Sequence, residues 1–157
     1  MNEDSHFWSW LAGFIDGEGS IGIRRNAYKK QRFSYKPYFS LAQKNRNVID
    51  FIQSKIGGLI AVDKGKPNCF YHHFFIYNRD KLQDILPKLI PFLKIKNKQA
   101  ELMLEYYNNC PHNDAKCYKL RGEYFKQFML LNTHGNGDKG GRYLEFERKL
   151  KSKEIRS

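Results

Sequence analysis

Apolar residues alternate with polar or small residues in two neighbouring segments near the N-terminus. The alternating apolar positions are Ile21, Ile23, Phe39 and Leu41. A period of two is typical of a strand with one buried face. The pattern therefore predicts strands over residues 20–25 and 34–43, joined by the polar and basic connection 26–33 into an antiparallel ribbon.

A second pair of short strands is predicted over 59–64 and 70–77, with a turn-like segment between them. Apolar residues spaced by three or four positions predict helices on either side of the strand pairs. The predicted helices cover residues 7–16, 48–56, 79–86, 97–109, 118–131 and 142–151. Pro87 and Pro91 interrupt the helical pattern after the third of these.

The order of these elements is α-β-β-α-β-β-α with helical additions, which defines an α+β fold with one antiparallel sheet and extra C-terminal helices. The sequence contains neither an internal repeat nor a shift of composition that would mark a linker. We therefore expect one domain over 1–157, with a core at about 5–130 and a helical extension at about 131–157.

The chain is strongly basic, with 28 Lys and Arg against 16 Asp and Glu in 157 residues and a formal net charge of +12. The segment 19–49 contains no acidic residue. Its arginines and lysines are Arg24, Arg25, Lys29, Lys30, Arg32, Lys36, Lys44 and Arg46. Such a concentration indicates a polyanionic partner, and at this point nucleic acid, anionic lipid and mere solubility all remain open.

Composition narrows the class of protein. Aromatic residues make up 15% and apolar residues 41% of the chain, enough for a packed core, which excludes wholesale disorder. No apolar run reaches the ~20 residues that span a bilayer, and the N-terminus lacks a signal-peptide pattern, so we expect no membrane association. The odd set Cys69, Cys110 and Cys117 favours free thiols in a reducing compartment.

Small residues and an acid lie together at the end of the first predicted helix. Gly13 and Gly17 are four residues apart, so they share one face and allow a second helix to approach closely. Glu18 lies at the carboxyl end of this helix, where the helix dipole disfavours an unpaired carboxylate. A bound divalent cation would offset this unfavourable interaction. Two such helices packed together would bring two Glu18 carboxylates close. Two carboxylates with bound Mg²⁺ can carry out phosphodiester hydrolysis. A core helix with a glycine-rich exit turn and solvated acids is the alternative at this point.

Residues 11–19, LAGFIDGEG, resemble the signature of the LAGLIDADG homing endonucleases, with Gly at the seventh place and Glu for the final Asp. The element order, the basic ribbon and the segment 91–100 (PFLKIKNKQA) are also similar to the single-motif branch of that family. The resemblance covers roughly residues 5–130. It implies the homing-endonuclease fold and a site-specific, Mg²⁺-dependent DNA endonuclease, with Mn²⁺ or Ca²⁺ substituting in binding.

The resemblance also implies roles for single residues. Glu18 takes the place of the metal-binding acid, Gly17 offers its backbone carbonyl to the metal, and Asp16 ends the helix rather than acting as a catalyst. Gln43 matches the polar residue that organises active-site water, and Lys98 matches the basic residue near the scissile phosphate. The catalytic residues expected on this basis are Glu18, Gln43 and Lys98.

Only one copy of the motif is present, so we expect a homodimer whose motif helices cross at the two-fold axis. The residues expected on that helix are Leu11, Ala12, Gly13, Asp16 and Gly17. Equal subunits imply equal half-sites, and therefore a long pseudopalindromic DNA duplex. The family resemblance further implies double-strand breaks with 3′ overhangs during intron or intein homing.

The basic ribbon fits the major groove of double-stranded DNA. Arg24 is the strongest candidate for a guanine contact, and Lys36, Tyr38 and Ser40 share its predicted solvent-exposed face. Weaker candidates for base contacts are Asn26, Tyr28, Lys64 and Tyr71. The predicted phosphate contacts are Arg25, Lys29, Lys30, Arg32, Lys44 and Arg46.

Two further functions are compatible with the same scaffold: an RNA-binding intron maturase and a DNA-binding protein that does not cleave. Glu18, Gln43 and Lys98 favour the nuclease, because neither alternative requires them. We expect an intracellular location, and a chloroplast or a mitochondrion if an organelle intron encodes the chain.

Overall fold

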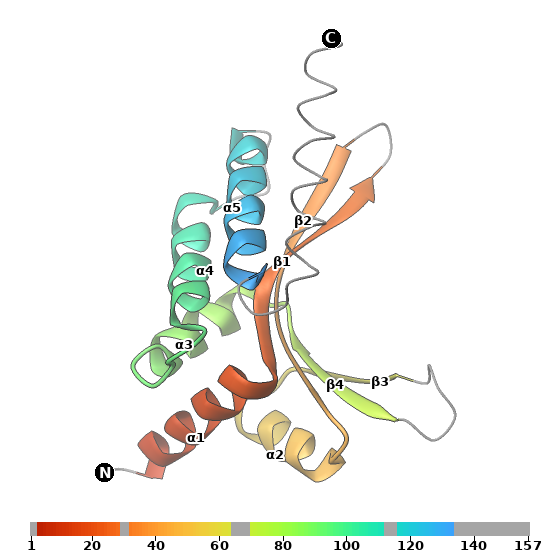
Figure 1. Cartoon of the computed structure of the whole chain (residues 1–157), viewed down its shortest axis with the longest axis vertical. Coiled ribbons are helices and arrows are strands. Elements are labelled where there is room, and N and C mark those ends of the chain that lie inside the picture. The colour runs from red at the N-terminus through yellow and green to blue at the C-terminus, as the bar shows by residue number, and fades with distance from the viewer. Residues whose placement is uncertain (1–2, 29–31, 64–69, 112–115, 134–157) are drawn as a thin grey trace.

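The computed structural model describes residues 3–28, 32–63, 70–111 and 116–133. Its elements are α1 (Glu3–Glu18), β1 (Gly19–Tyr28), β2 (Arg32–Gln43), α2 (Arg46–Ile56), β3 (Leu59–Asp63), β4 (Tyr71–Ile76), α3 (Arg79–Leu89), α4 (Asn97–Asn109) and α5 (Lys116–Thr133). Figure 1 shows these elements in the predicted order. The predicted α+β class is confirmed.

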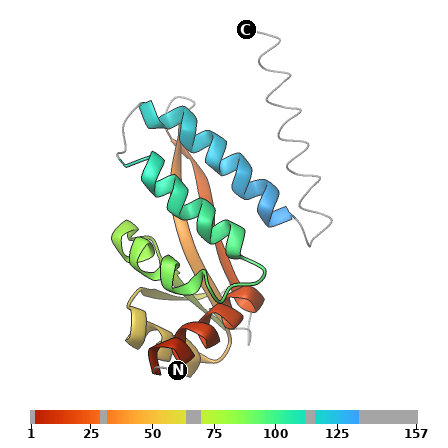
Figure 2. The same cartoon turned by 90° about the vertical axis from the view of Figure 1, so that its left-hand side faces the viewer.

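The four strands form one antiparallel sheet in the order β1-β2-β4-β3. The register pairs Gly19 with Leu41 and Arg24 with Lys36, and β2 continues to β4 through the pair Ser40 and Phe75. In Figure 1, α3, α4 and α5 lie on one side of the sheet, and no helix that the structure describes lies over the opposite side. Figure 2, viewed from the helical side, shows α4 and α5 in front of the β1–β2 ribbon.

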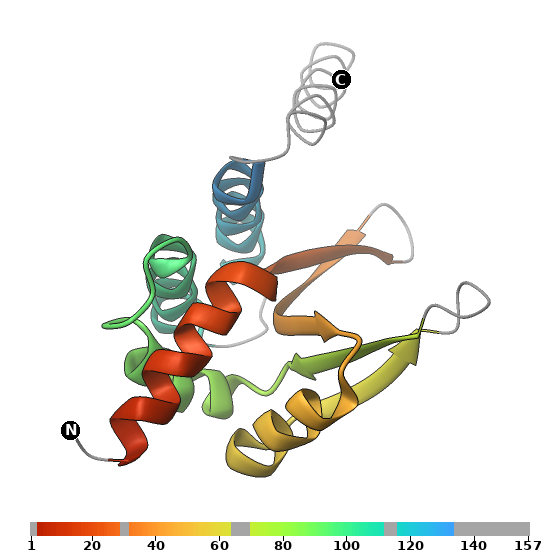
Figure 3. The same cartoon turned by 60° about the horizontal axis from the view of Figure 1, so that its bottom comes forward.

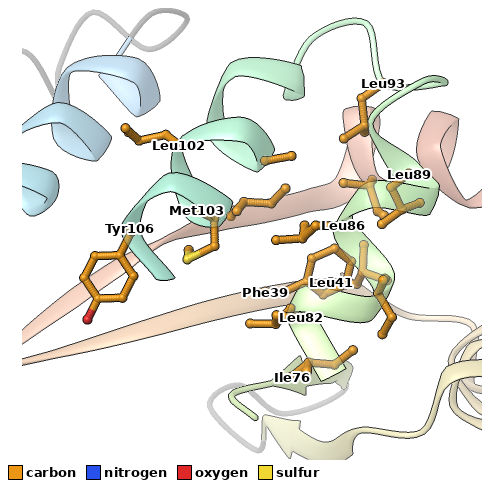
Figure 4. Packing of buried hydrophobic residues seen from close by; sticks show 14 of the residues in the cluster. Phe39, Leu41, Ile76, Leu82, Leu86, Leu89, Leu93, Leu102, Met103 and Tyr106 are labelled. Atoms are coloured by element: carbon orange, nitrogen blue, oxygen red, sulfur yellow. The ribbon is translucent and has the colours of Figure 1, made fainter. Parts of the chain in front are cut away.

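The core lies between the sheet and this helical layer. The strands contribute large side chains that are almost completely buried, among them Phe39, Leu41 and Phe74. Helix α3 presents Leu82, Leu86 and Leu89 toward them at helical spacing, as Figure 4 shows. Burying one such side chain contributes about 1.5–3 kcal/mol. The sheet is therefore held rigidly on one face and left available on the other.

Two glycines define how α1 and α2 end. A side chain on Gly19 would place its Cβ only 2.7 Å from the backbone oxygen of Ile15, so glycine alone lets β1 leave the helix at this angle. Gly57 has a φ of 66° and caps α2, which begins at the N-cap Asn45. Asn45 accepts a hydrogen bond from the backbone nitrogen of Asn47 at 3.0 Å.

Several boundaries differ from the sequence-based ones. Helix α1 and the first two strands are longer than predicted. Helix α3 continues through Pro87 to Leu89 because the burial of Leu86 and Leu89 offsets the hydrogen bond lost and the crowding at the proline. The predicted helix at 142–151 lies outside the described residues. No helix described by the structure is both long and apolar enough for a membrane span. Neither Cys110 nor Cys117 is in a disulfide, and Cys69 lies outside the described ranges.

Candidate active site and nucleic-acid interface

The uncovered face of the sheet carries the side chains predicted to read DNA. Because paired residues of antiparallel strands point to the same face, the register places Arg24 with Lys36, and Tyr38 and Ser40 follow at alternate positions. The prediction that these four residues share one face is confirmed. The same register places Asn26 on this face, where it lines an open hollow of about 500 Å³ with Arg24 and Lys36.

Arg24 is held over aromatic rings. Its guanidinium lies 5.1 Å from the ring centre of Tyr38 and 5.9 Å from that of Phe75. Such cation–π contacts restrict the side chain while leaving its hydrogen-bond donors available. The Tyr38 hydroxyl is 3.2 Å from the Ser20 hydroxyl oxygen, so this ring is itself anchored to β1. Arg24 is therefore preorganised for contact with a ligand on this face.

A column of four aromatic or imidazole rings runs along β4 on the same face, formed by Tyr71, His73, Phe75 and Tyr77. The ring centres are 6.5, 5.9 and 5.5 Å apart in sequence order. Of the four, only Tyr71 was among the predicted contacts. The signal for the others is present in the sequence as alternation at 71, 73, 75 and 77, but it becomes meaningful only once the exposed face is known.

The remaining predicted DNA contacts lie in different surroundings. The Lys44 ammonium lies 5.4 Å from the ring centre of Tyr71, beside the column. Arg46 lies in the first turn of α2 and pairs with Asp50 at 2.7 Å. Tyr28 and Arg32 are paired at the end of the ribbon. Lys29, Lys30 and Lys64 lie outside the described residues.

Arg25 lies on the opposite face of the sheet, because neighbouring strand residues point to opposite sides. Its guanidinium lies 4.3 Å from the ring centre of Phe33 and 5.3 Å from that of Phe125 on α5. The structure therefore gives Arg25 a packing role between β1 and the helical layer, and does not favour the predicted phosphate contact.

The two acids of the motif have different surroundings at the end of α1. The Asp16 carboxylate accepts hydrogen bonds from the backbone nitrogens of Lys94, Ile95 and Lys96 at 2.7, 3.2 and 2.9 Å. Asp16 thus fastens α1 to the segment that precedes α4. The Glu18 side chain is exposed and makes no hydrogen bond or ion pair with the residues described. Glu18 is the acid available for a ligand.

Lys96 is the basic residue beside Glu18. Its ammonium donates a hydrogen bond of 2.5 Å to the backbone oxygen of Asp16. Burial lowers the pKa of Lys96, while the negative charges of Asp16 and Glu18 oppose that shift. A partly desolvated ammonium beside an exposed carboxylate is suited to contact a phosphate.

The prediction that Lys98 is this basic residue is not supported by its position. Lys98 is exposed in the first turn of α4 and lines a hollow between α4 and α5 with Glu101 and Gln127. The physical reason is the helical turn of about 100° per residue. Lys96 precedes α4 and reaches α1, whereas two positions later the side chain points away from it.

Gln43 ends β2, two residues beyond the partner of Gly19, and so lies at the same end of the sheet as Glu18. Its side-chain oxygen accepts a hydrogen bond from the backbone nitrogen of Lys44 at 2.7 Å, which leaves the amide nitrogen as a donor. A role in organising water stays a prediction for this residue.

The exposed side of α1 is only partly the one predicted. Leu11 and Ala12 are completely buried in the chain's own core, because the helical period places them on the inner face with Ile15. They cannot contact a partner helix, which corrects the prediction. At Gly13 and Gly17 an added Cβ would meet no atom of the described chain within 4 Å. Figure 3 shows one side of α1 with no described element in front of it.

The residues at this end fit a hard divalent cation only in part. Mg²⁺ prefers carboxylate, carbonyl and water oxygens, and Glu18 with the Gly17 carbonyl offers two such donors. Within the described ranges there is no cluster of three side chains that could hold a metal ion. A complete site would therefore need ligands beyond the side chains described, water among them.

The element order and the uncovered sheet beside an acidic helix end define the homing-endonuclease class of fold. A solved structure of the homing endonuclease I-CvuI, in complex with the I-CreI target in the presence of Mg with DNA not cleaved, gives a TM-score of 0.71 at 25% identity, covering 82% of this chain and 83% of that one. An archaeal intron-encoded homing endonuclease, I-Vdi141I complexed with DNA, gives a TM-score of 0.62 at 26% identity, covering 82% and 81%. The family model for LAGLIDADG endonuclease matches residues 11–110, and the chain belongs to this family.

Two curated relatives show the same likeness in sequence. The DNA endonuclease I-CreI of Chlamydomonas reinhardtii is 31% identical over 112 residues, which are 69% of this chain and 66% of the relative. The DNA endonuclease I-CvuI of Chlorella vulgaris is 28% identical over 106 residues, which are 67% of this chain and 66% of the relative. The match thus spans slightly less than two thirds of each relative's length.

Proposed function

We propose that the protein is a site-specific homing endonuclease that cleaves a long pseudopalindromic DNA duplex as a homodimer. The observation that carries the proposal is the position of Glu18, an exposed carboxylate without a partner among the described residues, next to Lys96 and at the edge of a cationic sheet face. The family membership and the relatives named as DNA endonucleases support it.

The open face of α1 supports the homodimer. Gly13 and Gly17 leave space that nothing in the described chain fills, and Trp10 and Phe14 stack on the same side of the helix with ring centres 5.6 Å apart. A second copy of α1 packed on this face would bring a second Glu18 close to the first. The two carboxylates and the two Gly17 carbonyls would then hold divalent cations that neither chain holds alone.

Bound Mg²⁺, Lys96 and Gln43 have different parts in the proposed reaction. When bound, Mg²⁺ supplies positive charge and makes a coordinated water more acidic at the scissile phosphate. The Lys96 ammonium stabilises the negative charge that develops on the phosphate, and Gln43 orients water through its amide. One strand would be cut by each of two equivalent sites, leaving the 3′ overhangs that the family resemblance implies.

Cleavage of duplexes selected from a randomised library, with and without EDTA, tests this proposal. We expect Mg²⁺-dependent double-strand cleavage by the natural chain. Glu18→Gln should abolish cleavage and retain DNA binding in Ca²⁺, because the amide keeps the shape and loses the charge. Glu101→Gln, the same exchange on an exposed part of α4, is the matched control and should cleave normally.

The alternatives give different results in the same assay. Loss of binding as well as cleavage in Glu18→Gln would show that Glu18 is structural. Binding of RNA and DNA without cleavage of either would favour the maturase, and specific DNA binding indifferent to EDTA would favour a protein that does not cleave.

A further inference from the structure

The sheet face contains a strip without Lys, Arg, Asp or Glu between Arg24 and Lys36 at one end and Lys44 at the other. In the strand register, Phe75 lies between Ser40 and Leu59, and the next row places His73 between Ala42 and Ala61. We call Ala42, Leu59, Ala61, His73 and Phe75 the apolar rows. Arg24 and Lys36 lie on one side of these rows, and Lys44 lies on the other.

The side chains of the apolar rows are accessible from the uncovered face. Leu59 is 63% exposed, an unusual position for a leucine, and Ala61 is also exposed. Phe75 is partly buried and its ring is parallel to that of His73 within 7°. Because the rings of His73 and Tyr77 hold Phe75, contact of this side chain with a ligand costs little conformational entropy.

An apolar strip flanked by cations is complementary to the major groove of a duplex rich in thymine. Lys44 at one end can pair with a phosphate and Arg24 at the other can contact a base edge, so the bases between them face the apolar rows. The 5-methyl group of thymine is the apolar feature that base pairs present in this groove. Rows two residues apart are separated by about 6.4–6.8 Å, roughly the rise of two base pairs.

We propose that Leu59 and Phe75 read thymine through its 5-methyl group, so that each half-site contains A·T pairs next to the position read by Arg24. This inference rests on the proposed binding of duplex DNA, and it adds the base preference. It also favours DNA over RNA on this face, because uracil lacks the methyl group.

The test uses deoxyuridine, which pairs like thymidine and lacks only the methyl group. A half-site is first selected from a randomised duplex library, and each of its thymidines is then replaced singly. Binding is measured in Ca²⁺ without cleavage. We expect at least one replacement near the Arg24 position to weaken binding by the natural chain about fourfold, the effect of losing one buried methyl-sized group.

Leu59→Ala should weaken binding of the thymidine duplex and abolish the difference between the two duplexes. Because the Leu59 side chain is largely exposed, this substitution should not unfold the protein. Phe75→Ala should behave similarly if circular dichroism shows that it folds. Leu120→Ala, at an exposed leucine on α5, is the matched control and should retain the full difference.

A selected half-site without thymine, or equal binding of every deoxyuridine duplex by the natural chain, would overturn the inference. So would a methyl effect that persists unchanged in Leu59→Ala and in folded Phe75→Ala. Failure of the proposed function is distinguishable, because a protein that binds with the methyl effect but never cleaves would refute only the endonuclease.

Discussion

At the scale of single residues, two acids two positions apart in one motif do different work. The Asp16 carboxylate accepts hydrogen bonds from three backbone nitrogens of the segment before α4, whereas the exposed Glu18 makes no hydrogen bond or ion pair with the residues described. Both acids could be recognised in the sequence. The family resemblance also predicted different roles for them, but not the backbone partners of Asp16, because these lie about 80 positions later in the chain.

The lowered pKa of Lys96 predicts how cleavage depends on pH. If the ammonium is the active form, the rate should fall as pH rises through a pKa below the ordinary lysine value of 10.5. Lys96→Arg should remove this fall, because arginine stays protonated there.

The same pKa shift predicts how folding stability depends on pH. Between the lowered pKa and 10.5, Lys96 binds more protons in the unfolded chain than in the folded one, so the free energy of unfolding should rise with pH in the natural chain.

Rate profiles of both proteins on the same selected duplex check this prediction, with thermal unfolding across the same pH range. Identical profiles for lysine and arginine at this position would contradict a charge role for Lys96. Lys98→Arg, on the exposed side of α4, is the matched control and should leave the profile unchanged.

Arg24→Ala should relax the preference for guanine at one symmetric pair of target positions. The expected cost is about 1–3 kcal/mol if the guanidinium makes a bidentate contact. Competition binding with duplexes that vary at each position checks this. Uniform weakening across all sequences would instead show that Arg24 contacts phosphate.

At the scale of elements, the hydrophobic pattern was enough to predict the strands, because strict alternation assigns each residue of a strand to either the buried or the exposed face. It was not enough for the motif helix. Leu11 and Ala12 were expected on the packing face, but the helix buries them with Ile15 because the sheet lies on that side. The family resemblance led to Lys98, because the sequence alone does not show which side chain of this segment reaches α1.

Gly13→Leu tests the open face of α1. A Cβ at this position would meet no described atom within 4 Å, and leucine favours helix over glycine by nearly 1 kcal/mol, so the protomer should fold at least as well. The dimer should be lost, because a leucine prevents close approach of a second helix. Sedimentation velocity measures the change.

Asn108→Leu adds the same side chain at an exposed site on α4 and controls for nonspecific association. An unaffected dimer in Gly13→Leu would place the interface elsewhere.

At the scale of the whole molecule, the sheet separates two tasks. One face is fastened to α3, α4 and α5 through the core, and the other presents cations, aromatic rings and the apolar rows. The fold class and the basic ribbon could be predicted from the sequence. The aromatic column could not, because stacking along β4 depends on which face the helices leave open.

The central claim is that two copies of Glu18 converge on divalent ions beside DNA. Anomalous diffraction from crystals of the protein on its selected duplex with Mn²⁺ tests this most directly. We predict manganese peaks bound by the Glu18 carboxylates of two chains whose α1 helices are in contact. Carboxylates that lie far apart, with no manganese at either, would contradict the account.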